Sequence, residues 1–277
     1  MDLKDLNKLT ESLGKTAKMP VLFLGHGSPM NAIEENEFVQ GFRNVGRQIE
    51  KPHAILCISA HWETSGTRVT AMEHPATIHD FGGFPEELYR QQYPAPGSPD
   101  LARLAKETVT KTEVGLDHQW GLDHGAWTVI KHLYPNADVP VVQMSLDRFK
   151  DPQYHYELAS ELKALRERGV LVVGSGNMVH NLRMVAWDKL NADNYGYDWA
   201  MEARSRMNEM ILKGDHQSLI NYAAQGRAFQ LSVPTPEHYL PLLYVLGLKD
   251  DDDEVGLFND KALGGSLTMT SVKIGHA

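Results

Sequence analysis

Several histidines of this chain stand where an apolar run ends and the backbone must turn. His26 lies between two glycines in GHGSP, directly after VLFL, and His61 follows the run AILCISA. His180 follows a third run, VLVV, and the segment GSGNMV. Imidazole is a common ligand of zinc, iron, copper and nickel, and the ends of parallel strands meet at one edge of a sheet. These three histidines could therefore converge on one metal ion.

Two further histidines occupy similar positions. His124 follows an aspartate in GLDHGAW, just before a predicted helix, and His238 lies in PTPEHYLPL. There, Thr235 is a candidate N-cap and Pro236 a candidate first helical residue. Structural zinc sites favour thiolates, but the chain has a single cysteine, Cys57. Histidines with open coordination positions predict a catalytic metal instead.

Some neighbouring residues are candidates for substrate binding. Ser28 does not fit the G-x-S-x-G nucleophile elbow, so we expect it to cap the backbone or contact a substrate. His79 and Phe81 belong to the segment HDFGGFP, residues 79–85, whose glycines permit close approach and whose phenylalanines offer apolar surface to an aromatic ring. A packed surface loop is the alternative for this segment. Other histidines are predicted at the surface: His53, His132, His155, His216 and His276.

The composition argues against several kinds of partner. The net charge is −9 and no basic block is present, whereas nucleic acids and anionic membranes attract clustered Lys and Arg. No run of about 18 apolar residues predicts a membrane span. The N-terminus does not resemble a signal peptide, and a single cysteine suits a reducing compartment. We expect a cytoplasmic protein that binds neither nucleic acid nor membrane.

Apolar runs alternate with helical patterns along most of the chain. Strands are predicted at residues 20–25, 54–60, 68–72, 139–145, 170–174 and 267–274. Helices are predicted at residues 36–49, 99–109, 152–169 and 197–214. Continuous apolar runs suit strands that are buried on both faces. The alternation predicts an α/β fold, a single-domain α/β/α sandwich with a central mixed, largely parallel sheet.

The first 18 residues stand apart from this pattern. In segment 1–18 the leucines recur at roughly helical spacing, which favours a short arm that packs on the body or on a partner subunit, with a flexible tail as the alternative. Residues 19–277 are predicted to form the catalytic domain. Whether the chain forms a homo-oligomer is left open.

Seven segments, in order, carry a resemblance to a known family. They are LFLGHGSPMN, SAHW, PATIHDFGGFPEELY, YPAPGSP, GLDHGAW, GSGNMVHNLR and PTPEHYLPLLYVLG. Together they resemble the class III extradiol ring-cleavage dioxygenases, in particular the bacterial 4,5-DOPA dioxygenase branch. The resemblance spans roughly residues 20–275. It implies one divalent metal ion, Zn²⁺ or Fe²⁺, with Fe²⁺ expected for ring cleavage, and a catechol such as DOPA and O₂ as substrates.

The resemblance also implies roles for the five histidines. His26 and His61 would be metal ligands, and His238 would take the place that a glutamate fills in many members of the family. His180 would be the catalytic acid/base, or a fourth ligand when no substrate is bound. His124 would bind the substrate hydroxyl or oxygen.

Two other classes of function remain open from the sequence. A zinc hydrolase could use a metal-bound hydroxide on the same three-histidine centre. A non-catalytic metal-binding protein could share the fold, although the presence of all five histidines disfavours it.

Overall fold

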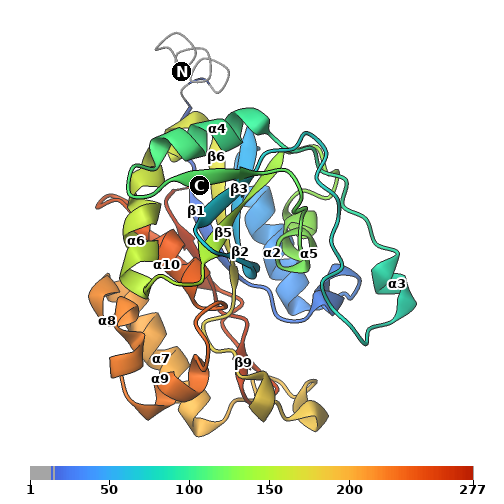
Figure 1. Cartoon of the computed structure of the whole chain (residues 1–277). Coiled ribbons are helices and arrows are strands. Elements are labelled where there is room, and N and C mark those ends of the chain that lie inside the picture. Colours follow the sequence, from blue (N-terminus) through green and yellow to red (C-terminus); the bar gives the residue numbers. More distant parts are fainter. Residues whose placement is uncertain (1–13, 15, 277) are drawn as a thin grey trace.

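A central sheet of eight strands crosses the protein, in the order β4-β3-β5-β2-β6-β1-β10-β7 (Figure 1). The computed structural model describes residue 14 and residues 16–276. The strands of this sheet are β1 (Val21–Gly25), β2 (Ala54–Thr64), β3 (Thr67–Thr70), β4 (Val114–Asp117), β5 (Val141–Asp147), β6 (Val170–Gly176), β7 (Val255–Phe258) and β10 (Ser271–Ile274). Two short strands, β8 (Ala262–Leu263) and β9 (Leu267–Thr268), pair separately.

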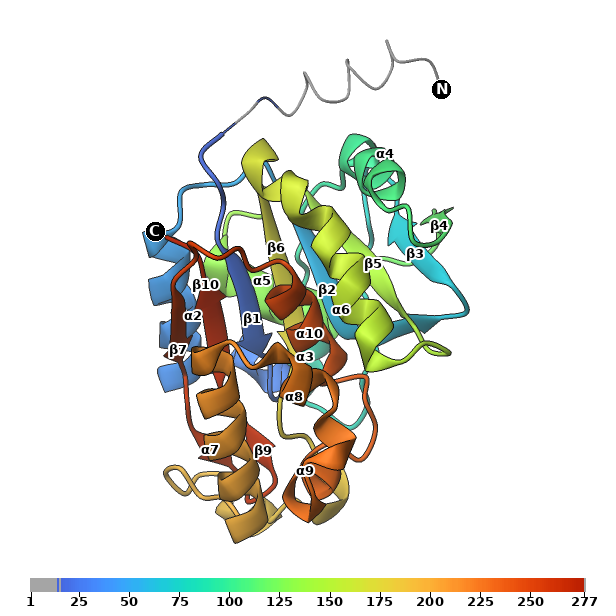
Figure 2. The same cartoon turned by 90° about the vertical axis from the view of Figure 1, so that its left-hand side faces the viewer.

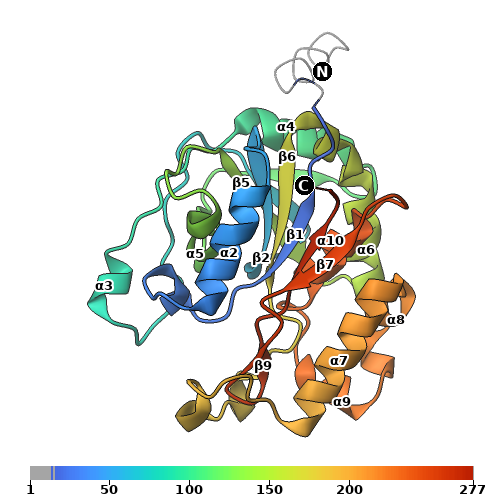
Figure 3. The same cartoon turned by 180° about the vertical axis from the view of Figure 1, so that it is seen from behind.

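Helices cover both faces of the large sheet. One face carries α4 (Pro99–Thr108), α6 (Pro152–Glu161) and α10 (Leu240–Gly247), and Figure 2 shows α6 and α10 in front of the strands. The other face carries α2 (Glu37–Gln48) and α5 (His124–Leu133), with α2 in front of the sheet in Figure 3. The predicted α/β/α sandwich is confirmed.

The centre of the sheet is parallel and its margins are mixed. Strands β5, β2, β6 and β1 are parallel neighbours. In contrast, β10 runs antiparallel to both β1 and β7, and β3 runs antiparallel to β5. The carboxyl ends of β1, β2 and β6 therefore share one edge of the sheet. Beyond this edge lie α7 (Asp198–Lys213), α8 (His216–Ile220) and α9 (Arg227–Ser232), at the bottom of Figure 2.

Strand β1 shows why continuous apolar runs form the centre. Val21 and Phe23 belong to the core beneath α6 and α10, whereas Leu22 and Leu24 belong to the core beneath α2 and α5. All four side chains are fully buried. Successive side chains of a strand point to opposite faces, so a strand covered on both sides must be apolar throughout.

Strand β2 is longer than predicted, and this changes the setting of His61. The strand continues to Thr64, so His61 lies inside it rather than after its end. The pairing with β5 shifts register between Ile58 and Glu63, which is the mark of a bulge. Bulges re-aim side chains near the rims of sheets, and this one lies where His61 leaves the apolar core.

Two other predicted elements differ in extent. The predicted helix 152–169 is α-helical only in α6 and continues as a 3₁₀ helix, Leu162–Arg168, up to Gly169. Arg166 of that tighter turn is fully buried, so tertiary contacts override the helical pattern. The predicted strand 267–274 is divided into β9 and β10, which belong to different sheets.

Two histidines predicted at the surface are buried. His132 of α5 is 7% exposed, and its Nε2 lies 2.7 Å from the carbonyl oxygen of Asn31. His155 of α6 is fully buried, with Nδ1 3.2 Å from the Tyr244 hydroxyl. Each ring satisfies one nitrogen inside a helix interface, which a helical position alone does not reveal.

The predicted N-terminal arm lies largely outside the described residues. Where the chain is described, the amide of Thr16 donates to Glu167 and that of Met19 donates to Arg166, at 2.9 Å each. Among the described residues, no helix is long and apolar enough to cross a membrane.

Candidate metal centre

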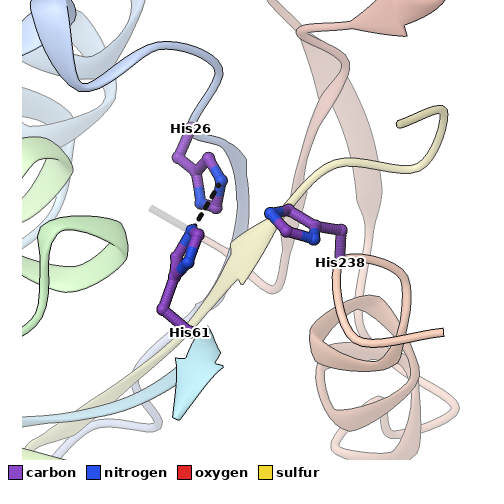
Figure 4. Close-up of side chains that lie close together, drawn as sticks. All are labelled: His26, His61 and His238. Carbon is purple, nitrogen blue, oxygen red and sulfur yellow. Dashed lines mark hydrogen bonds between the residues drawn. The ribbon is translucent and has the colours of Figure 1, made fainter. Parts of the chain in front are cut away.

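Three imidazoles meet at the carboxyl edge of the sheet (Figure 4). His26 follows β1, His61 lies in β2 and His238 lies in the turn before α10. The ring centroids are 5.1 Å apart for His26 and His61, 5.3 Å for His26 and His238, and 5.0 Å for His61 and His238. One ligand atom of each histidine lies within 4.8 Å of the other two, so a single ion could contact all three.

The backbone around His26 is fixed by its neighbours. The His26 amide donates to Gly176 at the end of β6, and the Asn31 side chain donates to the His26 carbonyl, both at 3.0 Å. Gly27 has a φ of 62°, which favours glycine, and a Cβ there would lie 2.5 Å from the sulfur of Met269. Glycine at this position thus allows the sharp turn that aims His26 at the rim.

A hydroxyl group determines which nitrogen of His26 is free. Ser175 Oγ lies 3.0 Å from His26 Nδ1 and donates a hydrogen bond to the carbonyl of Gly125. The serine oxygen therefore accepts a hydrogen bond from the Nδ1–H group, and Nε2 keeps its lone pair. Burial, with smaller contributions from neighbouring histidines, lowers the pKa of His26 well below its usual value. His26 is thus neutral, as a metal ligand must be.

His61 packs closely against α5. A Cβ at Gly125 would lie 2.8 Å from the His61 ring, so this helix can approach only because that residue is glycine. The Nε2 atoms of His61 and His26 face each other at 3.4 Å. Burial first, and then the nearby His124 ring, lowers the pKa of His61 well below its usual value. His61 is therefore neutral and turned toward the same centre.

His238 does not lie in the first turn of a helix as predicted. It lies in a turn that precedes α10, where the amide of Tyr239 donates to Pro236 at 2.9 Å. Thr235 does not act as the predicted cap, because its hydroxyl donates to Glu237 Oε1 at 2.8 Å. The same Oε1 lies 3.1 Å from His238 Nδ1.

Two more histidines extend the group at either side. His180 stacks on His238, with centroids 3.6 Å apart and planes 11° apart, and its amide donates to Ser232 at 2.8 Å. His124, the first residue of α5, lies 3.8 Å from His61 by ring centroids. The structure therefore brings all five predicted histidines together. His26, His61 and His238 form a central triangle, with His180 beside His238 and His124 beside His61. We call these five residues the histidine row.

The comparison with known proteins agrees with this geometry. A family model described as the catalytic LigB subunit of aromatic ring-opening dioxygenase matches residues 19–271. The chain belongs to the LigB family. This LigB-family protein is 47% identical over 264 residues to the Escherichia coli (strain K12) protein named 4,5-DOPA dioxygenase extradiol, covering 94% of this chain and 96% of that one. A Beta vulgaris protein of the same name is 34% identical, over 91% and 94% of the two chains.

A solved structure supports the same assignment. The crystal structure of an uncharacterized Escherichia coli K12 protein matches with a TM-score of 0.79 and 42% sequence identity, covering 93% of this chain and 100% of that chain. The predicted resemblance is confirmed, and this LigB-family protein is an extradiol ring-cleavage dioxygenase.

The LigB family implies a metal cofactor, and the residues of this dioxygenase fit one. The nitrogens of His26, His61 and His238 converge, and burial keeps His26 and His61 neutral. Imidazole nitrogen suits both zinc and iron.

The predicted substrate residues of the dioxygenase have mixed positions. Ser28 caps the backbone, since its Oγ accepts from the Met30 amide at 3.2 Å. Phe81 reaches the histidine row, with its ring 5.5 Å from that of His124. His79 contacts the segment after α3 (Glu86–Tyr89) instead, with Nε2 2.9 Å from the carbonyl oxygen of Gln91.

Sequence reasoning missed two carboxylates that lie beside the row. Asp80 Oδ2 lies 3.0 Å from His124 Nδ1 and 3.9 Å from His61 Nδ1. Glu237 contacts His238. Burial raises the pKa of each carboxyl, but the contacts with histidine outweigh burial, so that of Asp80 is lowered and that of Glu237 falls to about 2. A carboxylate adjacent in sequence to a candidate histidine was the available signal.

A separate cleft lies elsewhere in the dioxygenase. It has a volume of about 480 Å³ and is lined by residues of α2, α5 and their flanking loops, including Arg43, Lys131 and Glu35. None of the predicted site residues lines it. Since the convergent nitrogens define the chemistry, we place the site at the histidine row and not in this cleft.

Proposed function

We propose that this chain is a metal-dependent extradiol dioxygenase that inserts O₂ into the ring of a catechol such as DOPA, by 4,5-cleavage to a seco-DOPA product. The observation that carries the proposal is the convergence of His26, His61 and His238, with one further histidine on either side. The names of the relatives in Escherichia coli and Beta vulgaris support DOPA as the first substrate to test.

In this proposal His26, His61 and His238 hold one divalent ion, Zn²⁺ or Fe²⁺, with Fe²⁺ expected for ring cleavage. When bound, the metal would lower the pKa of a catechol hydroxyl and pass electron density between the ring and O₂. Three protein ligands would leave positions open for substrate.

His180 is proposed as the catalytic base. Burial, followed by the influence of His238, lowers the pKa of His180 to about 3, so its imidazole is neutral. A neutral imidazole has the free lone pair that a general base needs. The stacking on His238 holds the ring beside a proposed ligand. In the absence of substrate, His180 is a candidate fourth ligand.

His124 is proposed to bind the substrate hydroxyl or oxygen. Its amide donates to Asp80 Oδ1 at 2.8 Å, and its Nδ1 lies 3.0 Å from Oδ2 of the same carboxylate. The Asp80 carboxylate thus lies beside the Nδ1 edge of the ring, and Nε2 is the nitrogen proposed to meet the substrate. Phe81, Ser28 and His79 are proposed to shape the substrate pocket, with Phe81 beside the substrate ring.

The remaining proposals concern the setting of the enzyme. Residues 19–277 would form the catalytic domain and segment 1–18 an arm. We infer a cytoplasmic enzyme without nucleic-acid or membrane partners, because the chain has a net charge of −9 and one cysteine, Cys57, which is buried. A homo-oligomer is the assembly to test by light scattering.

The decisive test is anaerobic reconstitution of metal-free protein with Fe²⁺, followed by addition of DOPA and then air. We expect a yellow ring-opened product formed with uptake of one O₂ for each product molecule. Protein loaded with Zn²⁺ serves as the matched control. Hydrolysis of ester or amide substrates by the zinc form, without oxygen uptake by the iron form, would favour the zinc hydrolase. Metal binding without turnover of any catechol would favour a binding protein.

A further inference from the structure

Glu237 stands directly behind His238 as seen from the other two ligand candidates. Its Oε1 lies 3.1 Å from His238 Nδ1, the ring nitrogen nearer the backbone. Figure 4 shows that the opposite end of the ring points toward His26 and His61. The Glu237 side chain is 22% exposed, so its charge is partly shielded from water.

A carboxylate can only accept hydrogen bonds, so Nδ1 of His238 must carry the proton of this contact. Nε2 then keeps its lone pair and faces the centre. Carboxylates behind ligand histidines fix the tautomer and orientation of the ring and raise its basicity. Three neutral imidazoles carry no charge to balance a divalent cation, and the nearest available charge on this side is that of Glu237.

We propose that Glu237 is a positioning residue that orients His238 toward the metal and supplies negative charge to the three-histidine centre. The inference rests on the proposed function, since it concerns the same metal. In this arrangement the carboxylate acts on the ion through His238 and not as a ligand of its own.

A direct ligand role for Glu237 is the main alternative. Glu237, His180 and His238 also have ligand atoms within 4.8 Å of one another. The contact to Nδ1 argues against this role, because a carboxylate bound there faces the backbone side of the His238 ring. A purely structural role, in which Glu237 only ties the turn through Thr235, is the other alternative.

Metal affinity of the unloaded protein separates these roles. Metal-free parent and variants are titrated with Co²⁺ and Zn²⁺ against a chelator of known affinity, and the Co²⁺ absorption spectrum reports the ligand set. We expect Glu237→Gln to weaken binding by about 10–100-fold, with an unchanged Co²⁺ spectrum and an unchanged melting temperature of the metal-free protein. Glu237→Ala should weaken binding further, because it also removes the contact to Nδ1.

Two control variants sharpen the result. Glu63 lies near enough that burial and the charge of Glu237 raise its pKa, so Glu63→Gln removes a neighbouring charge without removing the contact to His238. Thr235→Val removes the other hydrogen bond to Oε1. Both should bind metal within about twofold of the parent.

Several results would overturn the inference. Parent-like affinity in Glu237→Gln and Glu237→Ala would leave Glu237 only a turn residue. A changed Co²⁺ spectrum in Glu237→Gln would make it a ligand. An affinity loss that follows a lowered melting temperature would make its role structural. A parent protein that binds no metal would overturn both the proposed function and this inference. If the parent binds metal but the Glu237 variants bind it equally well, only the inference fails.

Discussion

Titratable side chains are buried near both ends of the parallel strands β1 and β6, but their charges are balanced in different ways at the two ends. At the amino end, Arg166 is fully buried and its Nη atoms contact both oxygens of Asp253, at 2.5 and 2.9 Å. It also donates to the carbonyls of Met19 and Leu248, each at 2.8 Å. The charge of this arginine is thus matched by a carboxylate and by backbone oxygens.

At the carboxyl end, groups of one kind are gathered instead. The nitrogens of His26, His61 and His238 face one another, and burial keeps the first two rings neutral. The carboxylates Asp80 and Glu237 contact the row from its margins. The two clusters differ in what balances them. The charge of Arg166 is balanced by groups of the protein, whereas the lone pairs of the converging imidazoles are suited to balance by a bound cation.

The largest effect is expected when a proposed metal ligand at the carboxyl end of the strands is removed. We expect His26→Ala, His61→Ala and His238→Ala each to lose most of the bound metal, because each variant removes a proposed ligand. The loss of metal affinity should exceed the factor of about 10–100 that is typical when a residue hydrogen-bonded to a ligand is replaced. Metal content after dialysis measures it. His53→Ala, an exposed histidine before β2, is the matched control and should retain metal. Full metal content in any of the three variants would remove that residue from the ligand set.

The next largest effect distinguishes a catalytic base from a metal ligand within the histidine row. His180→Ala should keep its metal but lower kcat by about 10²–10⁴-fold, the usual contribution of one acid/base group. Metal content and single-turnover rate are measured on the same preparation. Loss of metal in step with activity would make His180 an obligatory ligand, and the acid/base role would then pass to His124.

The amino end should respond in stability and not in metal binding. Asp253→Asn removes the carboxylate that contacts both Nη atoms of the buried Arg166 and should cost about 3–5 kcal/mol of unfolding free energy. Urea unfolding of the metal-free protein measures it. Asp252→Asn is the matched control: its side chain is 71% exposed and pairs with Lys18, so the loss should be about 0–1 kcal/mol. Reduced metal affinity in folded Asp253→Asn would mean that the two ends are coupled.

The same pair predicts how stability depends on pH. Burial alone would raise the pKa of Asp253, but the contacts with Arg166 outweigh burial and hold it well below its usual value. This contribution is therefore fully present above the ordinary aspartate pKa of about 3.9 and is lost as the pH falls below it. The parent should lose stability more steeply than Asp253→Asn as the pH falls below about 4. Parallel curves for the two proteins would contradict the assignment.

The contrast between the two ends also shows what the sequence could predict. The runs before His26 and His180 are continuous and apolar, so hydropathy alone predicts β1 and β6. Their alternation with helical patterns predicts the fold class. The position of His61 inside β2 depends on a register shift against β5, which local pattern does not encode.

The partners of the histidines were harder to predict for a related reason. Glu237 and Asp80 are each adjacent in sequence to a candidate histidine, yet Asp80 contacts His124, 44 residues away. Arg166 and Asp253 are 87 residues apart. Such pairs form only once the sheet has brought distant segments together. Hydropathy predicts which segments are buried, but not which polar atoms meet there.

The smallest expected effect concerns substrate binding beside the histidine row. Phe81 lies 5.5 Å from the His124 ring and 5.4 Å from that of Phe84, so it joins the loop 79–85 to the histidine row. An aromatic contact contributes about 0.5–1.5 kcal/mol, which corresponds to about a two- to tenfold change in affinity. We therefore expect Phe81→Ala to raise the KM for DOPA by about that factor, with kcat and melting temperature nearly unchanged. Phe149→Ala, at a phenylalanine that is 74% exposed, is the control. An unchanged KM with a lowered melting temperature would show that the loop only packs, and the apolar wall for the substrate ring would have to come from another segment.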